Sequence, residues 1–180
     1  MPHRIFIETP RLLLREWLPQ DEAPFIALNS DKEVMEFFPA TFNAEETRHH
    51  IKRISTQINE KGYGWFAVER KDSHAFIGFT GLSHPGFEST FTPCTEIGWR
   101  LAKEHWGNGF ATEAAKACLQ FGFEQLGLDT IYSFTAIPNT RSENVMKKIG
   151  MQKAGTFLHP KLEEGHFLQE HVLYKISRHQ

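Results

Sequence analysis

"HWGNGFATEAAKACLQFGF", residues 105–123, places Gly107 and Gly109 one residue apart, directly before a segment with helical spacing. Glycine permits left-handed backbone angles and close approach by other groups, so the pair predicts a tight loop that opens a helix. The first turn of such a helix has unpaired N–H groups and the positive end of the helix dipole. We therefore expect an anion site here, formed without a lysine.

The helix expected from about Phe110 to Leu126 has one face of very small side chains, which lets it lie close to a sheet. Its members follow at helical spacing: Ala111, Ala114, Ala115, Cys118 and Gly122. A tight turn without a ligand is the alternative interpretation of the two glycines. Two nucleotide-binding motifs fit poorly, because no Lys-Ser or Lys-Thr follows the loop and Thr112 replaces the third glycine of a dinucleotide fingerprint.

Periodicity elsewhere predicts alternating strands and helices. Expected helices cover 21–28, 31–37, 43–62 and 139–150, with Asn43 and either Asn139 or Thr140 as N-caps, Glu143 completing a capping box, and Gly62 and Gly150 as C-terminal stops. Expected strands are "RLLLRE", "GWFAVER", "AFIGFTGLSH", "TEIGWRLA", "IYSFTAI", "MQKAGTF" and "QEHVLYKI", with a bulge or a close backbone approach at Gly98. This order predicts a mixed α/β sheet covered by helices, in one domain over residues 1–180.

Composition narrows the functional classes. The 180 residues carry 20 Lys and Arg against 22 Asp and Glu, a net charge of -2, so no global basic field favours nucleic acid or an anionic membrane. Cys94 and Cys118 form no C-x-x-C unit and are expected to be reduced structural thiols. The ten histidines form no H-x-x-x-H pair with a nearby carboxylate ligand, so we expect no metal site. We find no leader or membrane-spanning run and expect a cytoplasmic protein.

"EIGWRLAKEHWGNGFATEA", 96–114, resembles the acetyl-coenzyme A signature of the GNAT N-acetyltransferase superfamily, and within it the ribosomal-protein N-terminal acetyltransferase branch. "TPRLLLRE", 9–16, is similar to that branch's opening strand, and "NTRSENVMKKIGM", 139–151, to its Asn-x-x-Ser helix. The resemblance covers residues 8 to 176. It implies the GNAT fold: a single mixed, mostly antiparallel sheet of about seven strands, splayed at the centre and flanked by helices.

The resemblance also implies acetyl-CoA as cosubstrate and no metal. In the family the glycine loop wraps the pyrophosphate with N–H groups, and the splayed strand before it pairs with the pantetheine arm, with a bulge at Gly98 opening the gap. The implied cofactor-binding residues are Trp99, Arg100, Leu101, His105, Trp106, Gly107, Asn108, Gly109, Phe110, Ala111, Thr112 and Asn139. Asn139 has a plain helix cap as its alternative role. Glu104 departs from the Gln or Arg common in the family, which removes a possible phosphate partner.

The implied reaction is direct attack by a primary amine on the thioester in a ternary complex. An alkyl ammonium has a pKa of ~10 and an α-amino group ~8, so a base must first take a proton. Glu96 is the candidate base, with an edge residue paired to Arg100 or to solvent as the alternative. A backbone N–H near Trp99 would hold the oxyanion. Ser142 is the candidate proton donor to the thiolate, or else a serine bonding its own helix; Tyr132 and Tyr174 are spare candidates.

The acceptor is the least visible partner: a protein N-terminus or a small-molecule amine. Glu88, Glu163 and Glu164 make two loops acidic, which favours a cationic acceptor. The main alternative function is a non-catalytic acyl-CoA-binding sensor with the same fold, which needs neither Ser142 nor Glu96. The protein is expected to be a monomer or homodimer, with neither nucleic acid nor membrane as a partner.

Overall fold

The computed structural model describes residues 3–178. The chain forms β1 (Ile5–Glu8), β2 (Leu12–Arg15), α1 (Glu22–Ser30), α2 (Ala44–Lys61), β3 (Trp65–Arg70), β4 (Phe76–Ser83), β5 (Glu96–Leu101), α3 (Phe110–Glu124), β6 (Thr130–Ala136), α4 (Thr140–Lys148), β7 (Gln152–Leu158) and β8 (Glu170–Ser177). Short 3-10 turns cover Pro19–Asp21 and Lys103–His105. No helix within 3–178 is long and apolar enough to cross a membrane.

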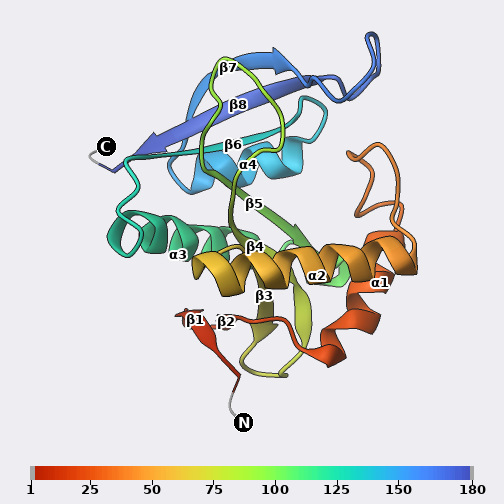
Figure 1. Ribbon diagram of the computed structural model, residues 1–180, viewed down its shortest axis with the longest axis vertical. Coiled ribbons are helices and arrows are strands. Elements are labelled where there is room, and N and C mark those ends of the chain that lie inside the picture. Colours follow the sequence, from red (N-terminus) through yellow and green to blue (C-terminus); the bar gives the residue numbers. More distant parts are fainter. Residues whose placement is uncertain (1–2, 179–180) are drawn as a thin grey trace.

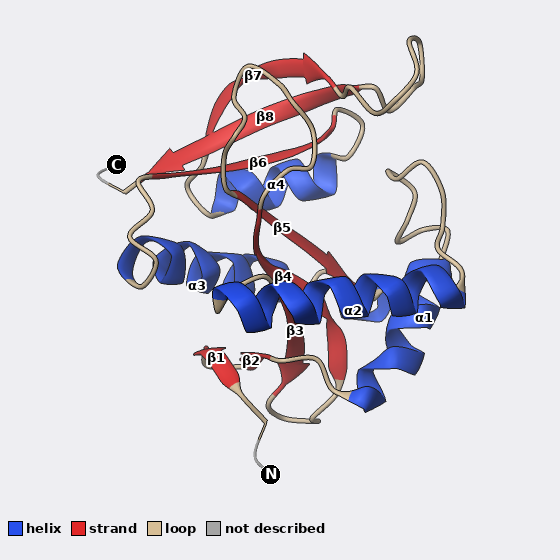
Figure 2. Ribbon diagram, in the orientation of Figure 1, coloured by secondary structure: helices blue, strands red, loops and turns tan. Residues whose placement is uncertain are grey.

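The strands form one sheet in the order β1-β2-β3-β4-β5-β6-β8-β7 (Figure 1). All neighbours are antiparallel except β5 and β6, which run parallel and are paired only at Glu96 and Tyr132. Beyond that pair the two strands diverge, and Figure 2 shows β6, β8 and β7 as one group and β1 to β4 as another, with β5 running between them. The sheet is therefore splayed at its centre, and β5 has an open edge toward β6.

The predicted fold class is confirmed, with eight strands instead of about seven. The additional strand is β1, which pairs with β2 across the Thr9-Pro10 turn. The expected helix over 31–37 is wrong, because these residues form turns after α1 ends at Ser30. There the carboxylate of Asp31 accepts hydrogen bonds from the N–H groups of Glu33 and Val34, at 2.8 and 3.4 Å, and turns the chain.

Helix termini mostly follow the predicted capping residues. Asn43 and Glu46 form a reciprocal capping box at the start of α2, and Gly62 ends it with a left-handed φ of 76°. At α4 the cap is Asn139, and the predicted capping box with Glu143 is wrong. The Glu143 carboxylate instead accepts a hydrogen bond from the Tyr174 hydroxyl at 2.8 Å, which ties α4 to β8.

The small-residue face of α3 packs closely on the sheet, as predicted. Ala114, Ala115 and Cys118 are fully buried. A Cβ atom added at Gly122 would lie 2.8 Å from Cδ1 of Ile131, so only glycine fits this contact without a shift. Close packing brings the start of α3 to the centre of the splayed sheet.

The predicted bulge at Gly98 is wrong. The pairing of β4 with β5 runs from Gly78↔Leu101 to Ser83↔Glu96 without a register shift. A Cβ atom at Gly98 would instead lie 3.0 Å from the Trp65 ring, so this glycine allows a close approach by that side chain. The sheet opens because β5 and β6 share one paired position, not because β5 bends at Gly98.

Candidate active site

A cavity of about 600 Å³ lies at the splay between β5 and β6, bordered by the glycine loop, α4 and the segment after α1. Its lining includes both predicted catalytic residues, Glu96 and Ser142, and all the predicted cofactor-binding residues except Asn108. The sequence-derived set thus converges on one cavity, although Glu96 and Ser142 lie 46 residues apart in the chain.

The glycine loop has the geometry expected of an anion cradle. Gly107 and Gly109 adopt left-handed φ values of 74° and 77°, and Gly109 is the N-cap of α3. Within residues 3–178, the N–H groups of 107–112 donate to no other residue. The three residues at the tip, 107–109, are exposed. Free N–H groups at a helix N-terminus attract a negatively charged ligand such as phosphate.

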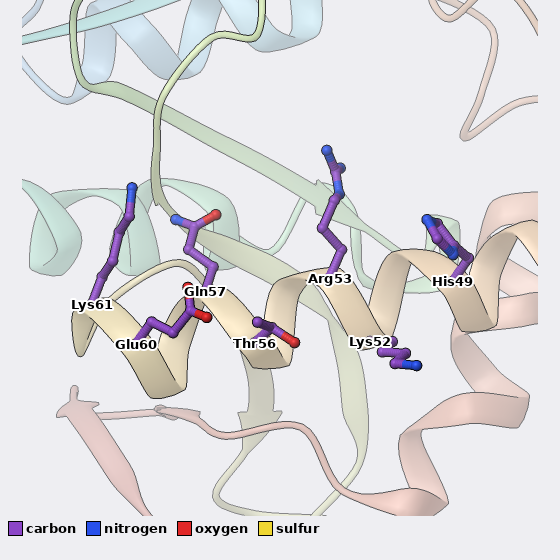
Figure 3. Close-up of a pocket in the computed structure, with 7 residues that line it drawn as sticks. All are labelled: His49, Lys52, Arg53, Thr56, Gln57, Glu60 and Lys61. Atoms are coloured by element: carbon purple, nitrogen blue, oxygen red, sulfur yellow. The ribbon is translucent and has the colours of Figure 1, made fainter.

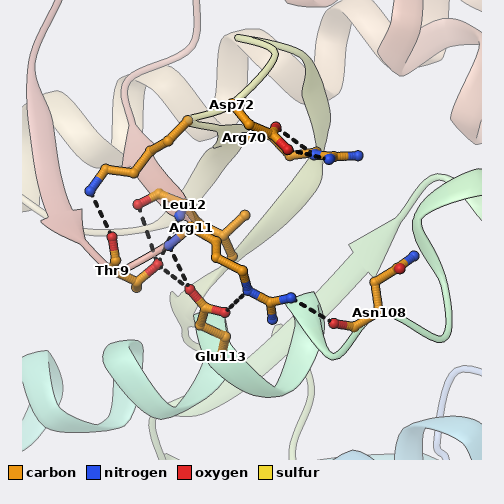
Figure 4. Close-up of polar contacts among 8 residues, drawn as sticks. Thr9, Arg11, Leu12, Arg70, Asp72, Asn108 and Glu113 are labelled. Carbon is orange, nitrogen blue, oxygen red and sulfur yellow. Dashed lines mark hydrogen bonds and ion pairs between the residues drawn. The ribbon is translucent and has the colours of Figure 1, made fainter.

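The loop is anchored to the N-terminal turn by a cluster of polar contacts that sequence reasoning missed (Figure 4). The Glu113 carboxylate, in the first turn of α3, accepts hydrogen bonds from the Thr9 hydroxyl at 2.6 Å and from Nε of Arg11 at 2.6 Å. Nη1 of Arg11 also donates to the carbonyl of Asn108 at 3.0 Å. Burial raises the pKa of Glu113, but the bonds from Thr9 and Arg11 outweigh it and lower the pKa below its ordinary value. The resemblance had singled out the segment with Thr9 and Arg11, but the sequence did not show that its partner is Glu113.

Asn108 stabilises the loop from within. Its side-chain amide donates to the carbonyls of His105 and Trp106, at 3.3 and 2.9 Å. Asn108 therefore shapes the loop, while the groups that line the cavity come from its neighbours.

Only every second residue of β5 directs its backbone N–H and carbonyl groups to the open edge toward β6. The N–H of Ala102 donates to Ile77 toward β4, and the carbonyl of Ile97 accepts from the Ser133 hydroxyl toward β6. Because peptide direction alternates along a strand, the N–H groups of Trp99 and Leu101 point to the open edge. The backbone of Arg100 faces β4, where its carbonyl lies 2.1 Å from a Cβ built on Gly78. The expectation that the Arg100 backbone joins the open edge therefore does not fit this geometry.

Asn139 and Ser142 meet at the first turn of α4. The Asn139 side chain accepts from the N–H of Ser142 at 3.2 Å and donates to the hydroxyls of Thr135 and Ser142, at 2.8 and 3.2 Å. Asn139 thus acts as a helix cap whose amide hydrogens are both used within the chain. The Ser142 hydroxyl accepts from Asn139 and lines the cavity, and its own hydrogen is donated to no residue within 3–178.

Glu96 begins β5 at the one position where β5 and β6 are paired. Its carboxyl group lines the cavity, and burial raises its pKa from 4.5 to about 7. No ion pair to Glu96 occurs within residues 3–178, which removes the interpretation of Glu96 as an edge residue paired with Arg100. A carboxyl group that titrates near neutrality suits a group that takes a proton at physiological pH.

The two spare tyrosine candidates lie outside the cavity, as do the two cysteines, which were expected to be structural. The Tyr174 hydroxyl is bonded to Glu143, and burial together with this bond raises the pKa of Tyr174 to about 12. Tyr132 stacks on Phe91 and does not line the cavity. Cys94 and Cys118 are free thiols whose pKa burial raises to about 11 and about 12. Ser142 is therefore better placed than either tyrosine. No cluster of metal-ligating side chains occurs among residues 3–178.

The acidic loops were expected to make the acceptor site negative, but the side chains that line the cavity are mostly positive. Glu88, Glu163 and Glu164 do not line it. The acidic loops therefore do not set its charge, because its lining carries Arg100, Arg141 and Lys148 against the single carboxylate of Glu96. Aromatic side chains that the sequence did not identify, Phe87 and Phe134 with His159, complete one wall.

A second, shallow hollow follows the outer side of α2 (Figure 3). It is lined by His49, Lys52, Arg53, Thr56, Gln57, Glu60 and Lys61. All of these except Gln57 are exposed, as on the solvated face of an amphipathic helix. This hollow is lined by one helix alone, whereas the cavity between β5 and β6 is lined by several segments of the chain.

Comparison with known proteins identifies the fold. A family model described as the acetyltransferase (GNAT) domain matches residues 11–152. The chain belongs to the GNAT acetyltransferases. This GNAT chain has the Gly-x-Gly loop and the splayed strands whose arrangement the resemblance implied.

Several relatives come from Bacillus subtilis, among them YkkB and YoaA. The uncharacterized protein YkkB is 36% identical to this GNAT chain over 152 residues, covering 82% of the chain and 86% of YkkB. The uncharacterized N-acetyltransferase YoaA is 32% identical over 153 residues, covering 83% and 84%. These relatives are similar along most of their length.

Solved structures agree in fold. An acetyltransferase of the GNAT family from Bacillus anthracis superposes with a TM-score of 0.81 at 28% identity. The match covers 98% of this chain and 100% of that chain. Ribosomal-protein-S5-alanine acetyltransferase from Vibrio fischeri gives 0.74 at 19% identity, covering 94% of each chain. Spermidine N-acetyltransferase from Vibrio cholerae, in complex with CoA and spermine, gives 0.74 at 21%, covering 95% and 98%. The last two show a shared fold alone.

Proposed function

We propose that this protein, acting as a single domain, transfers an acetyl group from acetyl-CoA to a primary amine by direct attack in a ternary complex. One observation carries the proposal: the unpaired N–H groups of 107–112 lie beside the open edge of β5, around a cavity that also holds Glu96 and Ser142. The N-acetyltransferase relatives and a structural neighbour crystallised with CoA support it. The acceptor is a protein N-terminus or a small-molecule amine.

The residues fit acetyl-CoA in its two polar regions. The six N–H groups of 107–112 provide the donors that a pyrophosphate requires, with no side-chain cation needed at the loop. The N–H of Leu101 offers strand-like pairing for an amide of the pantetheine arm, and the N–H of Trp99 is left for the thioester. When bound, acetyl-CoA supplies an activated thioester.

Three groups of the chain then serve the transfer. Glu96 takes a proton from the incoming ammonium, because a carboxyl group with a pKa of about 7 is partly ionised at neutral pH. The N–H of Trp99 at the open edge stabilises the oxyanion, a contribution of ~3 kcal/mol for one such donor. As the C–S bond breaks, the Ser142 hydroxyl donates a proton to the departing thiolate and regains one from the nitrogen, which loses its second proton when the amide forms; a thiol pKa of ~8.5 requires only a weak donor.

Calorimetric titration with acetyl-CoA tests the binding site. We expect the parent to bind and the folded Gly107→Pro variant to lose binding, because proline removes one loop N–H and cannot adopt a φ of 74°. Gly127→Pro is the matched control: Gly127 has a φ of 66°, but lies after α3 and does not line the cavity. Equal binding by the parent and Gly107→Pro would contradict the assigned cradle.

An amine screen in the presence of acetyl-CoA then distinguishes the enzyme from a non-catalytic sensor. Acetylation by the parent that is lost in a Glu96→Gln, Ser142→Ala double variant with retained acetyl-CoA binding supports the enzyme. Binding without transfer to any amine would favour the sensor.

A further inference from the structure

Arg100 is a buried cation on the side of β5 that faces α1. Its side chain is 8% exposed and lines the cavity. The guanidinium carbon lies 4.2 Å from the centre of the Phe38 ring and 5.3 Å from that of Phe79. Phe79 is the residue directly opposite Arg100 in β4 and packs with Phe25 and Leu28 of α1. The charge therefore sits under the segment that follows α1.

The hydrogen bonding of Arg100 is incomplete. Nη1 donates to Oδ1 of Asn29 at 2.7 Å, while Nε is buried and has no partner. No carboxylate forms an ion pair with Arg100 within residues 3–178. His50 also lines the cavity and is neutral there, because burial and the charge of Arg100 lower the pKa of His50 to about 4. A buried cation without an anionic partner is unfavourable, so a negatively charged ligand would stabilise it.

Arg15 shows how this chain satisfies an arginine that serves structure. Its side chain is 1% exposed, and all three of its nitrogens donate to neighbouring groups. Nε pairs with Glu69 at 2.6 Å, and the two Nη atoms pair with Asp21 at 2.7 and 2.9 Å. Arg100 is buried to a similar degree but lacks both carboxylates, which distinguishes it from a structural ion pair.

The position of Arg100 separates it from the phosphate cradle. Residues alternate along β5, so Ile97 and Leu101 pack in the core with Ala114 and Ala115 of α3, while Glu96 and Arg100 point to the opposite face. Arg100 and Glu96 thus share the face of β5 opposite α3, and both line the cavity. Their Cα atoms are four steps apart along the strand, which is about 13 Å. The distance between the carboxyl group and the guanidinium also depends on how far the two side chains extend.

We propose that Arg100 binds a carboxylate carried by the amine acceptor, so that the acceptor is a small amine with a carboxylate a short aliphatic chain away from the amino group. The inference rests on the proposed acetyl transfer. It places the amine near Glu96 and the carboxylate against Nε of Arg100, which has no partner in the chain. Asn29 holds the guanidinium in this orientation from α1.

The test compares acids with their amides on the same protein. The probes are ω-amino acids from 3-aminopropanoate to 6-aminohexanoate and the matching carboxamides, titrated calorimetrically into protein saturated with CoA. We expect at least one acid to bind about 10- to 100-fold more tightly than its amide, the range for hydrogen bonds to a charged group. Acetyl transfer from acetyl-CoA should show the same preference in kcat/KM.

Two variants locate the preference. Arg100→Gln should bind acid and amide equally, provided that thermal unfolding and acetyl-CoA titration show a folded, cofactor-binding protein. Arg141→Gln is the matched control, since Arg141 also lines the cavity but is paired with Glu36 at 2.8 Å and stacks on Trp106. It should keep the preference.

The inference fails if acids and amides bind the parent equally, if none of the acids binds, or if Arg100→Gln keeps the preference. These results leave the proposed acetyl transfer intact, provided acetyl-CoA binds and other amines are acetylated. If the parent does not bind acetyl-CoA, the proposed function is wrong. The acid probes can then be titrated without CoA, and they still report on Arg100. If Arg100→Gln fails to fold, the comparison of acid with amide on the parent decides the question.

Discussion

Replacing Glu96 by glutamine should make the protein more stable and less active at the same pH. Glutamine keeps the shape of the side chain and removes the charge. The pKa of Glu96 in the folded protein, about 7, lies above its ordinary value of 4.5 because burial disfavours the carboxylate. Protonation is therefore tighter in the folded state, and Glu96 destabilises the fold increasingly as the pH rises through 7.

The size of the effect follows from these two pKa values. One pKa unit corresponds to ~1.36 kcal/mol, so a rise from 4.5 to about 7 gives an upper limit of about 3 kcal/mol at pH 8. For a protein of this size that is an increase in Tm of roughly 6–12 °C. At pH 4.5, where Glu96 is mostly protonated in the folded state, the difference between the parent and Glu96→Gln should shrink sharply.

Activity should change in the opposite direction. Loss of a general base lowers kcat/KM by about 10²- to 10⁴-fold, measured at pH 8 as release of the CoA thiol with an amine from the screen. The parent's kcat/KM should rise with an apparent pKa of about 7, and this rise should be absent in the variant. Glu164→Gln, on an exposed loop, is the control for loss of one carboxylate and should change neither property.

Two results would refute this reasoning separately. A variant no more stable than the parent at pH 8, or a stability difference independent of pH, would show that burial does not raise the pKa of Glu96. Unchanged kcat/KM with the expected gain in stability would show that the carboxyl group is buried as described but takes no proton from the amine.

Other substitutions separate cofactor binding, proton donation and folding. Arg11→Met should raise the KM for acetyl-CoA about tenfold with little change in kcat, because it removes the side-chain bonds to Asn108 and Glu113 that hold the loop. The control is Arg70→Met, which also removes an arginine over the Phe110 ring and should leave the KM unchanged. An equal effect of the two variants would mean that the positive charge alone matters. Ser142→Ala should lower kcat by about 100-fold or more while calorimetry shows unchanged acetyl-CoA binding; unchanged kcat would remove Ser142 as the donor. Gly81→Ala should destabilise the fold by about 1–3 kcal/mol in thermal unfolding, since its Cβ would lie 1.9 Å from the carbonyl of Gly64; an unchanged Tm would show that the two strands can separate.

What the sequence predicted was local. The glycine loop, the small face of α3 and the Asn43 cap each depend on neighbours within one or two turns, and the structure has them as expected. The helix expected over 31–37 rested on the spacing of Val34 and Phe38, and it was wrong because Val34 is buried from a turn while Phe38 is exposed. Periodicity reports burial, and turns bury side chains as helices do.

What the sequence could not predict was pairing between distant segments. Thr9 and Arg11 meet Glu113 more than a hundred residues later in the chain, with separations of 104 and 102 residues. The raised pKa of Glu96 depends on burial by segments from several parts of the chain, which no single motif encodes. Likewise, the sequence does not distinguish Arg15 from Arg100, and only the fold shows that carboxylates pair with Arg15 and that Nε of Arg100 has no partner.

In the proposed reaction, the alternation along β5 would divide the two substrates between the faces and the edge of one strand. The odd-numbered residues direct their N–H groups to the open edge and their side chains toward α3, whose N-terminus carries the anion cradle. The even-numbered residues Glu96 and Arg100 direct their side chains to the opposite face, where the acceptor is proposed to bind. A substitution of an even-numbered side chain should therefore change selectivity among amines while leaving acetyl-CoA affinity nearly constant. The two affinities are separable because one is set mainly by backbone groups and the other by side chains.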